Sequence, residues 1–354
     1  MNYVKLKDVC TINMGQSPSS DSYNENGHGV PFFQGNADFG ERYPVTRKWC
    51  SAPTKMAAPE DILISVRAPI GAMNYAKEEC CIGRGLAALT PNREKVAPEY
   101  IFWLLKGKNE ELNRKGTGST FKAIGRNILE ETLVPNISLE KQTECAIILE
   151  KTYRVILSRK QQLQKLDELV KARFIEIFGN PLKNDKDFPT ILGETLFKLS
   201  NGKALPNNKR FTVGIPAYGG NGISWYTDEI LCDYDTVIIG RVGFQSGNVH
   251  LAKAPLWVTD NAMYISWINN KEYDIRFLCS LMEHIDFKRY QDAGDLKKIA
   301  QKPFMQMYYL MPPISLQKQY IAFVEQTNKS KVAVQKALDE AQLLFDSLMQ
   351  KYFG

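Results

Sequence analysis

The amino-acid sequence repeats itself once, and this duplication constrains the fold more than any other feature. The chain has 354 residues, so each copy takes about half of that length. Matches that recur in the same order indicate one structural unit built twice, and their unequal offsets indicate insertions in loops. The matching segments are Val30–Asn36 with Ile215–Asn221, Asp61–Arg67 with Asp235–Arg241, Pro135–Gln142 with Pro312–Gln319, and Phe178–Gly179 with Phe353–Gly354.

Each half begins with a region rich in Gly, Pro, Asn and aromatic residues, a composition typical of short strands joined by turns. The apolar runs Asp61–Val66 and Thr236–Ile239 predict strands. Tyr100–Leu105 and Arg276–Met282 predict a short helix in each half. Because strands and helices occur in separate stretches, we predict an α+β fold with two similar domains.

Each half ends in a stretch rich in Gln, Lys, Glu and Leu, without internal Gly or Pro, which predicts a long helix. Ser138 and Ser315 are typical helix N-caps, and Gly179 and Gly354 stand where C-capping glycines occur. The predicted organisation is a first domain at 1–135, a long helix at 136–180, a second domain at 181–312 and a second long helix at 313–354.

Apolar residues in the two predicted long helices recur in alternating steps of four and three, as in a coiled-coil seam. Arg159 and Arg173 interrupt the first seam. We expect them to reach solvent or acidic partners, because burying an unpaired charge is costly. Two helices of matched length most simply pack on each other; in the alternative, each covers its own domain. The predicted packing residues are Leu163, Leu166, Val170, Ile177, Val334, Leu338, Ala341, Phe345, Leu348 and Tyr352.

The composition limits the classes of protein to which this chain can belong. Its net charge of +6 permits a nucleic-acid partner without requiring one. The seven cysteines include no C-x-x-C pair, which argues against a disulfide framework and a zinc site. No apolar run approaches the roughly 18 residues of a membrane span, and the N-terminus lacks the order of a signal peptide. We therefore expect a soluble cytoplasmic protein without a membrane partner.

The sequence contains no complete catalytic constellation. It has no G-x-x-x-x-G-K-[ST] phosphate loop and no [ND]-P-P-[YF] tetrapeptide of the kind found in amino-methyltransferases. His28, His250 and His284 are scattered, without metal-ligand spacing. We expect no metal, no bound cofactor and no catalytic residue in this chain.

Both halves carry Arg, Lys, Asn and Gln residues in Gly-rich loops. Arg, Asn and Gln can read guanine and adenine edges bidentately, and Lys and Ser suit phosphate contacts, so we predict binding to double-stranded DNA. The candidates are Gln34, Asn36, Arg67, Arg84, Lys122 and Arg126 in the first half, together with loop residues 118–121, and Asn221, Arg241, Asn261, Lys297 and Lys298 in the second.

The duplication also predicts which loop residues read bases. If the two halves read different sequences, the residues kept in both should hold phosphates or the fold, namely the pairs Arg67/Arg241 and Lys122/Lys298. Base readers should then lie where the halves differ, at 37–48, 71–79, 203–213 and 244–250. The second seam with its flanking turns covers about 22 residues, or roughly 33 Å of helix, which is close to one DNA turn.

These features together resemble the DNA-specificity (S) subunit of type I restriction–modification systems. The resemblance covers essentially the whole chain and rests first on the order of domain, Pro-x-Ile-Ser-Leu-x-Lys-Gln helix, domain and second such helix. The resemblance also depends on four sequence motifs, namely Leu166–Phe174 with Phe178–Gly179, Phe121–Ile124, Ser65–Gly71 and Ile82–Ala87.

The resemblance implies two target-recognition domains separated by an antiparallel pair of helices, with each domain binding one half of a split DNA site. It implies a non-catalytic subunit that assembles with two adenine methyltransferase subunits, which bind S-adenosylmethionine, and with motor–nuclease subunits for cleavage. The chain departs from the family in being short and in having Gly240–Gly243 where a second Ser-Val-Arg-Ala-Pro phrase is expected.

Three alternatives stay open from the sequence. One is the specificity subunit of a combined restriction–methylation enzyme or another phage-defence methyltransferase. Another is a coiled-coil scaffold whose globular halves bind protein. The third is an autonomous methyltransferase.

Overall fold

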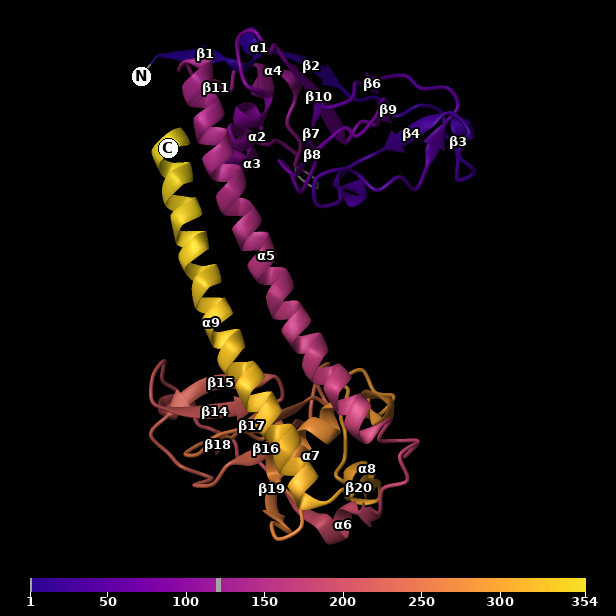
Figure 1. The fold of residues 1–354 in the computed structure, drawn as a ribbon, viewed down its shortest axis with the longest axis vertical. Helices are drawn as coiled ribbons and strands as arrows, with labels where there is room; N and C mark the ends of the chain where they lie inside the picture. The colour runs from indigo at the N-terminus through magenta and orange to yellow at the C-terminus, as the bar shows by residue number, and fades with distance from the viewer. Residues whose placement is uncertain (1, 119–121) are drawn as a thin grey trace. The chain divides into compact units, whose positions relative to one another are not determined.

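The computed structural model describes residues 2–118 and 122–354. The chain forms two compact units, of which unit 1 is residues 1–160 with 336–354 and unit 2 is residues 161–335 (Figure 1). Two 40-residue helices, α5 (Leu139–Phe178) and α9 (Ile314–Phe353), contribute one half each to both units. Each unit is therefore a globular part joined to the beginning of its own long helix and the end of the other.

In the residues of unit 1 that the structure describes, the chain forms three sheets and four short α-helices. The central sheet has the order β2 (Cys10–Met14), β10 (Leu86–Pro91), β7 (Ile62–Ser65) and β8 (Met73–Tyr75). A second sheet has the order β3 (Tyr23–Asn24), β5 (Trp49–Cys50), β4 (Val30–Phe33), β9 (Cys80–Ile82) and β6 (Met56–Ala57), and β1 (Tyr3–Lys5) pairs with β11 (Leu133–Pro135). The helices are α1 (Leu6–Val9), α2 (Pro98–Gly107), α3 (Asn109–Lys115) and α4 (Arg126–Glu130).

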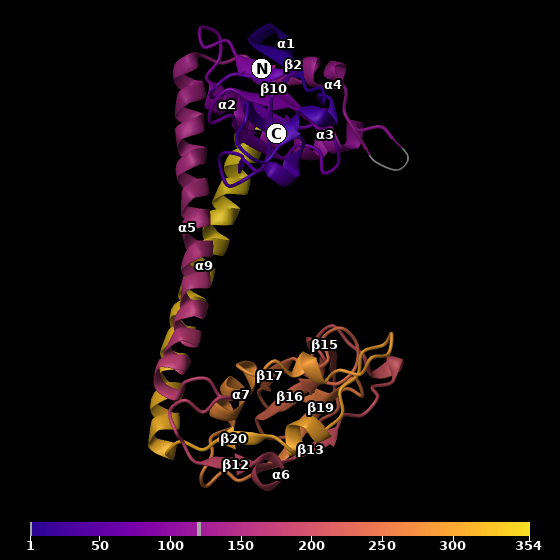
Figure 2. The same cartoon turned by 90° about the vertical axis from the view of Figure 1, so that its right-hand side faces the viewer.

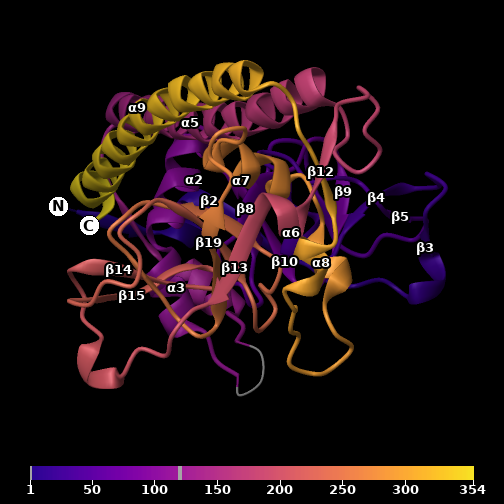
Figure 3. The ribbon, with the colours of Figure 1, turned by 90° about the horizontal axis from the view of Figure 1, so that it is seen from below.

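Unit 2 is built on the same plan, and Figure 3 shows its paired strands β13 and β19 side by side. Its central sheet has the order β13 (Phe197–Asn201), β19 (Ala262–Ile268), β16 (Thr236–Gly240) and β17 (Val249–Ala252). A second sheet has the order β15 (Gly222–Thr227), β14 (Ile215–Gly219) and β18 (Trp257–Val258), and β12 (Thr190–Leu192) pairs with β20 (Tyr308–Leu310). The helices are α6 (Gly193–Leu196), α7 (Ile275–Glu283) and α8 (Lys302–Met305).

The duplication predicted from the sequence is confirmed by the topology. The four strands of each central sheet follow one another in the same spatial order, and in both units a parallel strand pair, β4 with β9 and β14 with β18, stands beside that sheet. The expected α+β class and the short helices, α2 and α7, are confirmed as well. The sequence explains where these two helices begin, because Pro98 occupies the first turn of α2 and the Asp274 carboxylate caps α7.

In unit 1, helix α2 packs against both long helices. The ring centroid of Trp103 lies 5.3 Å from that of Tyr153 in α5 and 5.6 Å from that of Phe345 in α9. Tyr153 and Phe345 also contact each other, with centroids 5.9 Å apart. The core of unit 1 thus includes both helices, which excludes the alternative in which each helix covers only its own domain.

In unit 2, helix α7 takes the same position. The ring of Phe277 lies 4.8 Å from that of Phe178 at the end of α5, and Phe178 lies 5.5 Å from Tyr320 in α9. Asp167 of α5 pairs with Lys331 of α9. Because residues late in α5 contact residues early in α9, the two helices run antiparallel in this unit.

The seam positions of both helices avoid solvent. Val334, Leu338 and Phe345 are buried, and the other residues predicted to pack in the seam are half-buried. Arg173 meets the expectation of an acidic partner, because its guanidinium pairs with Glu176 at 2.8 Å.

The ends of the long helices agree with the sequence at three of the four expected caps. Ser138 Oγ accepts a hydrogen bond from the Lys141 N–H at 3.4 Å, Gly179 has a φ of +69°, and Gly354 follows the last residue of α9. The expectation for Ser315 is wrong. The carbonyl of Pro313 accepts from the N–H groups of residues 316 and 317, so α9 begins at Ile314 and Ser315 lies inside its first turn.

Candidate nucleic-acid interface

Four candidate residues of unit 1 meet at one end of its central sheet, where β7 ends and β10 begins. The Gly83 N–H donates to the Phe33 carbonyl at 2.8 Å, which places Arg84 beside Gln34. The Val66 N–H donates to the Gly85 carbonyl at 2.9 Å, which brings Arg67 to the same loops. We call Gln34, Arg67, Arg84 and Lys122 the first loop cluster, and all four side chains are exposed.

Lys122 joins this cluster through a backbone bridge. The Ala68 N–H donates to the Lys122 carbonyl at 3.0 Å, and Arg67 forms a β-bridge with Ala123. Residues that are far apart in the sequence therefore expose two arginines, a lysine and a glutamine on neighbouring loops. Ser119, Thr120 and Phe121, which belong to the predicted loop, lie outside the described residues.

The glycines beside Arg84 serve close backbone packing. A Cβ at Gly85 would lie 2.3 Å from the Gln34 carbonyl oxygen, and one at Gly83 would lie 3.2 Å from the Gln34 Cα. At position 85 only glycine allows the two loops to approach this closely. The two glycines therefore let the loop that carries Arg84 pack against the loop that carries Gln34.

A hollow of about 420 Å³ adjoins the first loop cluster, because Gln34 is part of its lining. The Asp38 carboxylate accepts a hydrogen bond from the Gln34 N–H at 2.8 Å and thereby holds the loop. The predicted residue Asn36 is half-buried in this loop. The hollow combines amide and cationic side chains, as suits base edges and phosphates. Its lining includes Phe32, Gln34, Asn36, Asp38, Arg47 and Lys48.

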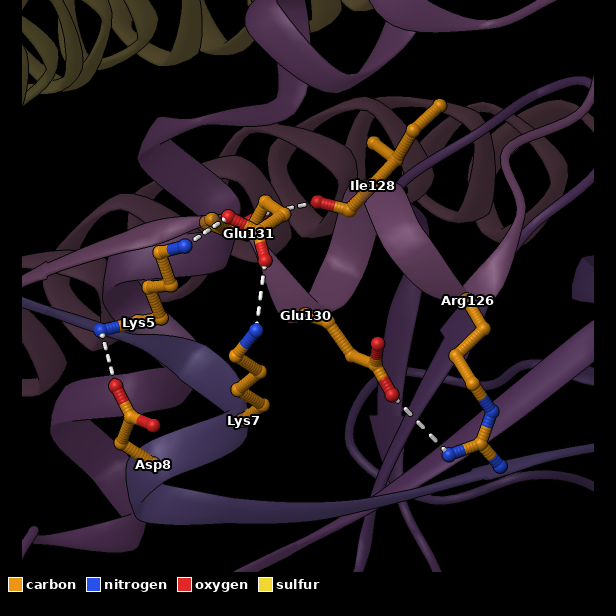
Figure 4. Close-up of polar contacts among 8 residues, drawn as sticks. Lys5, Lys7, Asp8, Arg126, Ile128, Glu130 and Glu131 are labelled. Carbon is orange, nitrogen blue, oxygen red and sulfur yellow. Dashed lines mark hydrogen bonds and ion pairs between the residues drawn. The ribbon is translucent and has the colours of Figure 1, made fainter.

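Arg126 lies apart from the first loop cluster. Its guanidinium pairs with Glu130 at 3.3 Å within helix α4, as Figure 4 shows. The same view shows Glu131 paired with Lys5 and Lys7. The charge of Arg126 is therefore already balanced locally.

Unit 2 repeats the arrangement at the corresponding end of its central sheet. The Arg241 N–H donates to the Asn261 carbonyl at 2.9 Å. A Cβ at Gly220 would lie 3.4 Å from that same carbonyl oxygen, so the turn that carries Asn221 packs against it. We call Asn221, Arg241, Asn261, Lys297 and Lys298 the second loop cluster. In Figure 2 the loops of unit 2 extend away from α5 and α9.

The hydrogen bonds correct one predicted correspondence between the units. In unit 1 the Ile124 N–H donates to the Val66 carbonyl at 2.9 Å, and in unit 2 the Ile299 N–H donates to the Arg241 carbonyl at 3.0 Å. Arg241 therefore corresponds to Val66 and not to Arg67. Because successive side chains of extended backbone point to opposite faces, the two arginines leave their strands on different sides.

The predicted lysine pair is displaced in the same way. The Lys122 carbonyl accepts from Ala68, and its counterpart, the Lys297 carbonyl, accepts from the Gly243 N–H at 2.7 Å. Lys122 thus corresponds to Lys297, and Lys298 is the next residue along. The sequence could not reveal this shift of one residue, because Lys297 and Lys298 are both lysines and either one matches Lys122 by residue type.

The sequence did not single out Trp225 as a candidate. Its ring is 46% exposed in β15, and the Arg210 guanidinium lies 5.4 Å from the ring centroid. Together with Phe211 and Val213 these residues line a hollow of about 560 Å³. Because Arg210 and Trp225 are far apart in the sequence, no local sequence pattern indicated this pair.

His250 lies close to the second loop cluster and is half-buried. Burial lowers the pKa of His250 below its ordinary value of 6.5, while a hydrogen bond with the Gly220 backbone opposes this change. The imidazole is therefore neutral at pH 7, and the positive charge of the cluster comes from its arginine and lysines.

Within residues 2–118 and 122–354, no group of three or more His, Cys, Asp and Glu side chains is placed to hold a metal ion. None of the helices in those ranges combines the length and apolarity that crossing a bilayer requires.

Comparison with known proteins gives a consistent result. Residues 1–168 match the type I restriction modification DNA specificity domain. A protein of Methanocaldococcus jannaschii named as a type I restriction enzyme MjaX specificity subunit is 41% identical over 160 residues, which are 45% of this chain and 38% of that protein. The MjaIX specificity subunit of the same organism is 28% identical over 197 residues, covering 51% of this chain and 45% of the relative.

The match to these two relatives thus spans less than half of their length. The type I restriction–modification S subunit from M. genitalium matches 100% of this chain and 96% of its own, with a TM-score of 0.71 and 16% identity, and so shares the fold. Residues 1–168 are thus similar to the type I restriction modification DNA specificity domain, and the whole chain shares the fold of the S subunit from M. genitalium.

Proposed function

We propose that this chain is a non-catalytic specificity subunit that binds a bipartite duplex DNA site, with one half-site for each loop cluster. The observation that carries this proposal is the repeated placement of basic and amide side chains at the same end of the same sheet in both units. Phosphate contacts by Arg and Lys supply affinity, and Gln or Asn contacts to base edges supply discrimination.

In this proposal the target-recognition domains are residues 1–135 and 181–312, and the helices at 136–180 and 313–354 join them. The helix pair sets the spacing of the half-sites and offers the docking surface for two adenine methyltransferase subunits, which bind S-adenosylmethionine. Motor–nuclease subunits would join the same complex for cleavage. The names of the relatives support the role of specificity subunit, since each is called one.

Filter binding to duplex DNA at 50 and 200 mM salt tests this function. A protein that neutralises about six phosphates loses roughly a thousandfold in affinity over that range. A scaffold that binds only protein shows no such slope, and this result would contradict the proposal. Transfer of labelled methyl groups by the purified chain alone would contradict its non-catalytic role.

A further inference from the structure

The most exposed aromatic ring in the second loop cluster's neighbourhood belongs to Phe244. Its side chain is 79% exposed, although burying a phenylalanine is normally favourable. It lies in the loop between β16 and β17, directly after Gly243, whose φ is +90°. The segment 244–250 is also one of those where the two halves differ in sequence.

The loop that carries Phe244 is held firmly in place. The Ser246 N–H donates to the Gly243 carbonyl at 3.0 Å, and the Gln291 side chain donates to the Ser246 carbonyl at 2.8 Å. A Cβ at Gly247 would lie 3.1 Å from the Phe287 carbonyl carbon, so the loop packs directly on the next segment. The backbone on both sides of Phe244 is thus held by hydrogen bonds and packing.

The surroundings of Phe244 are basic. The Lys288 ammonium lies 5.2 Å from the ring centroid. Of the nearby acids, Asp286 and Asp292 accept hydrogen bonds from backbone N–H groups, and Asp295 is exposed. Duplex DNA suits such a surface, because its phosphates are negatively charged and its stacked bases offer apolar faces to an aromatic ring. The cations on this loop and its neighbours are Arg241, Lys288, Arg289, Lys297 and Lys298.

We propose that Phe244 inserts its ring between adjacent base pairs of the half-site that unit 2 reads. This inference rests on the proposed function and adds a residue that reads the deformability of one base step. Phenylalanine is among the wedges by which proteins unstack and kink duplexes. Sequence preference then arises because pyrimidine–purine steps open at lower cost than others.

Unit 1 provides an internal comparison. Its Ala68 N–H makes the bond that Gly243 makes in unit 2, so Pro69 stands where Phe244 stands. The side chain of proline is short and bonded back to its own backbone nitrogen, so it projects less than the side chain of phenylalanine or leucine. We therefore expect unstacking by a wedge in the second half-site and not in the first.

The test uses the full chain with its methyltransferase subunits and the duplex that this complex enriches from a randomised library. 2-Aminopurine, an adenine analogue that fluoresces when unstacked, replaces each adenine of both half-sites in turn. We expect one fluorescent step in the second half-site in addition to any adenine that is methylated. Phe244→Ala should abolish that step and weaken binding roughly 5- to 150-fold, as loss of one base–aromatic stack does.

Two further variants sharpen the result. Phe244→Leu keeps an apolar wedge and should retain the fluorescent step. Tyr308→Ala removes a ring that is 64% exposed in the separate β12–β20 sheet and should leave binding unchanged.

Unchanged affinity and fluorescence in Phe244→Ala would overturn the inference while leaving the proposed function intact. In another outcome, Phe244→Ala binds more weakly although the wild-type complex shows no fluorescent step that depends on Phe244. That result would also overturn insertion of the ring. Failure of the wild-type complex to enrich any duplex would contradict the proposed function itself.

Discussion

Gln142 and Gln317 make the same hydrogen bond in the two units. Gln142 Oε1 accepts from the N–H of Ala97, the N-cap of α2, at 2.9 Å, and Gln317 Oε1 accepts from the N–H of Asp274, the N-cap of α7, at 2.9 Å. Each Nε2 also donates to a carbonyl just before its own long helix. These two buried side chains therefore fix each long helix to the short helix of its domain.

Replacing either glutamine by methionine should loosen only its own unit. Gln142→Met leaves buried backbone groups without partners, which costs about 1–3 kcal/mol. We expect hydrogen exchange to accelerate about tenfold or more at the start of α2, and Gln317→Met to do the same in α7. Gln319→Met, at an exposed position of α9, is the control. Equal protection in Gln317→Met and Gln319→Met would show that the bond is dispensable.

The lowered pKa of the Lys106 ammonium should make the stability of the fold depend on pH. This ammonium lies 3.8 Å from the Tyr153 ring centroid, and burial lowers the pKa of Lys106 from 10.5 to about 8. Between pH 8 and 10.5 the unfolded chain keeps a proton that the folded chain releases, so this group makes folding more favourable as pH rises.

The comparison of wild type with Lys106→Met isolates that contribution. From pH 7 to pH 10.5 the wild type should gain about 1–2 kcal/mol relative to the variant in thermal or denaturant unfolding. Lys151→Met, on the exposed face of α5, should follow the wild type. A stability difference that does not change with pH contradicts the prediction.

Removing a basic side chain from the first loop cluster should lower the affinity for duplex DNA of any sequence. Arg67→Ala should weaken binding to all duplexes and reduce the salt slope by about one, the value expected for a single phosphate contact. Arg126→Ala should change the slope less, because Glu130 already pairs with that guanidinium. Salt titrations of both variants measure this, and an unchanged slope in Arg67→Ala argues against the cluster.

If the helix pair sets the spacing of the half-sites, lengthening both helices should lengthen the gap between them. Four residues inserted after Gln161 in α5 and four after Gln335 in α9 lengthen each helix by about 6 Å, close to two base pairs. We expect the methylated motif to tolerate a gap about two base pairs longer. If the spacing of methylated sites stays the same, the helices do not determine it.

Much of this architecture was predictable, because it depends on patterns that span many residues. Steps of four and three indicated the long helices, and Gly-rich loops with basic residues indicated Arg67 and Arg241. The exact correspondence of the halves was not predictable. It depends on hydrogen bonds, which assign Arg241 to Val66 and Gln317 to Gln142, whereas residue identity paired Gln319 with Gln142.

The cap of α9 shows the same limit. Ser138 and Ser315 stand in nearly identical sequence, yet only Ser138 caps a helix, because Pro313 already occupies that position in α9. The proximity of the loops that carry Gln34 and Arg84 was also not predictable, because it depends on how closely the two loops pack at Gly83 and Gly85.

Methylome sequencing of the host with and without this gene tests whether the two units read the two halves of one DNA site. We expect adenine methylation at a motif of two specific half-sites separated by a fixed non-specific gap, lost on deletion and restored by the intact gene. Methylation that persists after deletion, or a gene-dependent motif that is continuous, would contradict the claim that the two units read the two halves of one site.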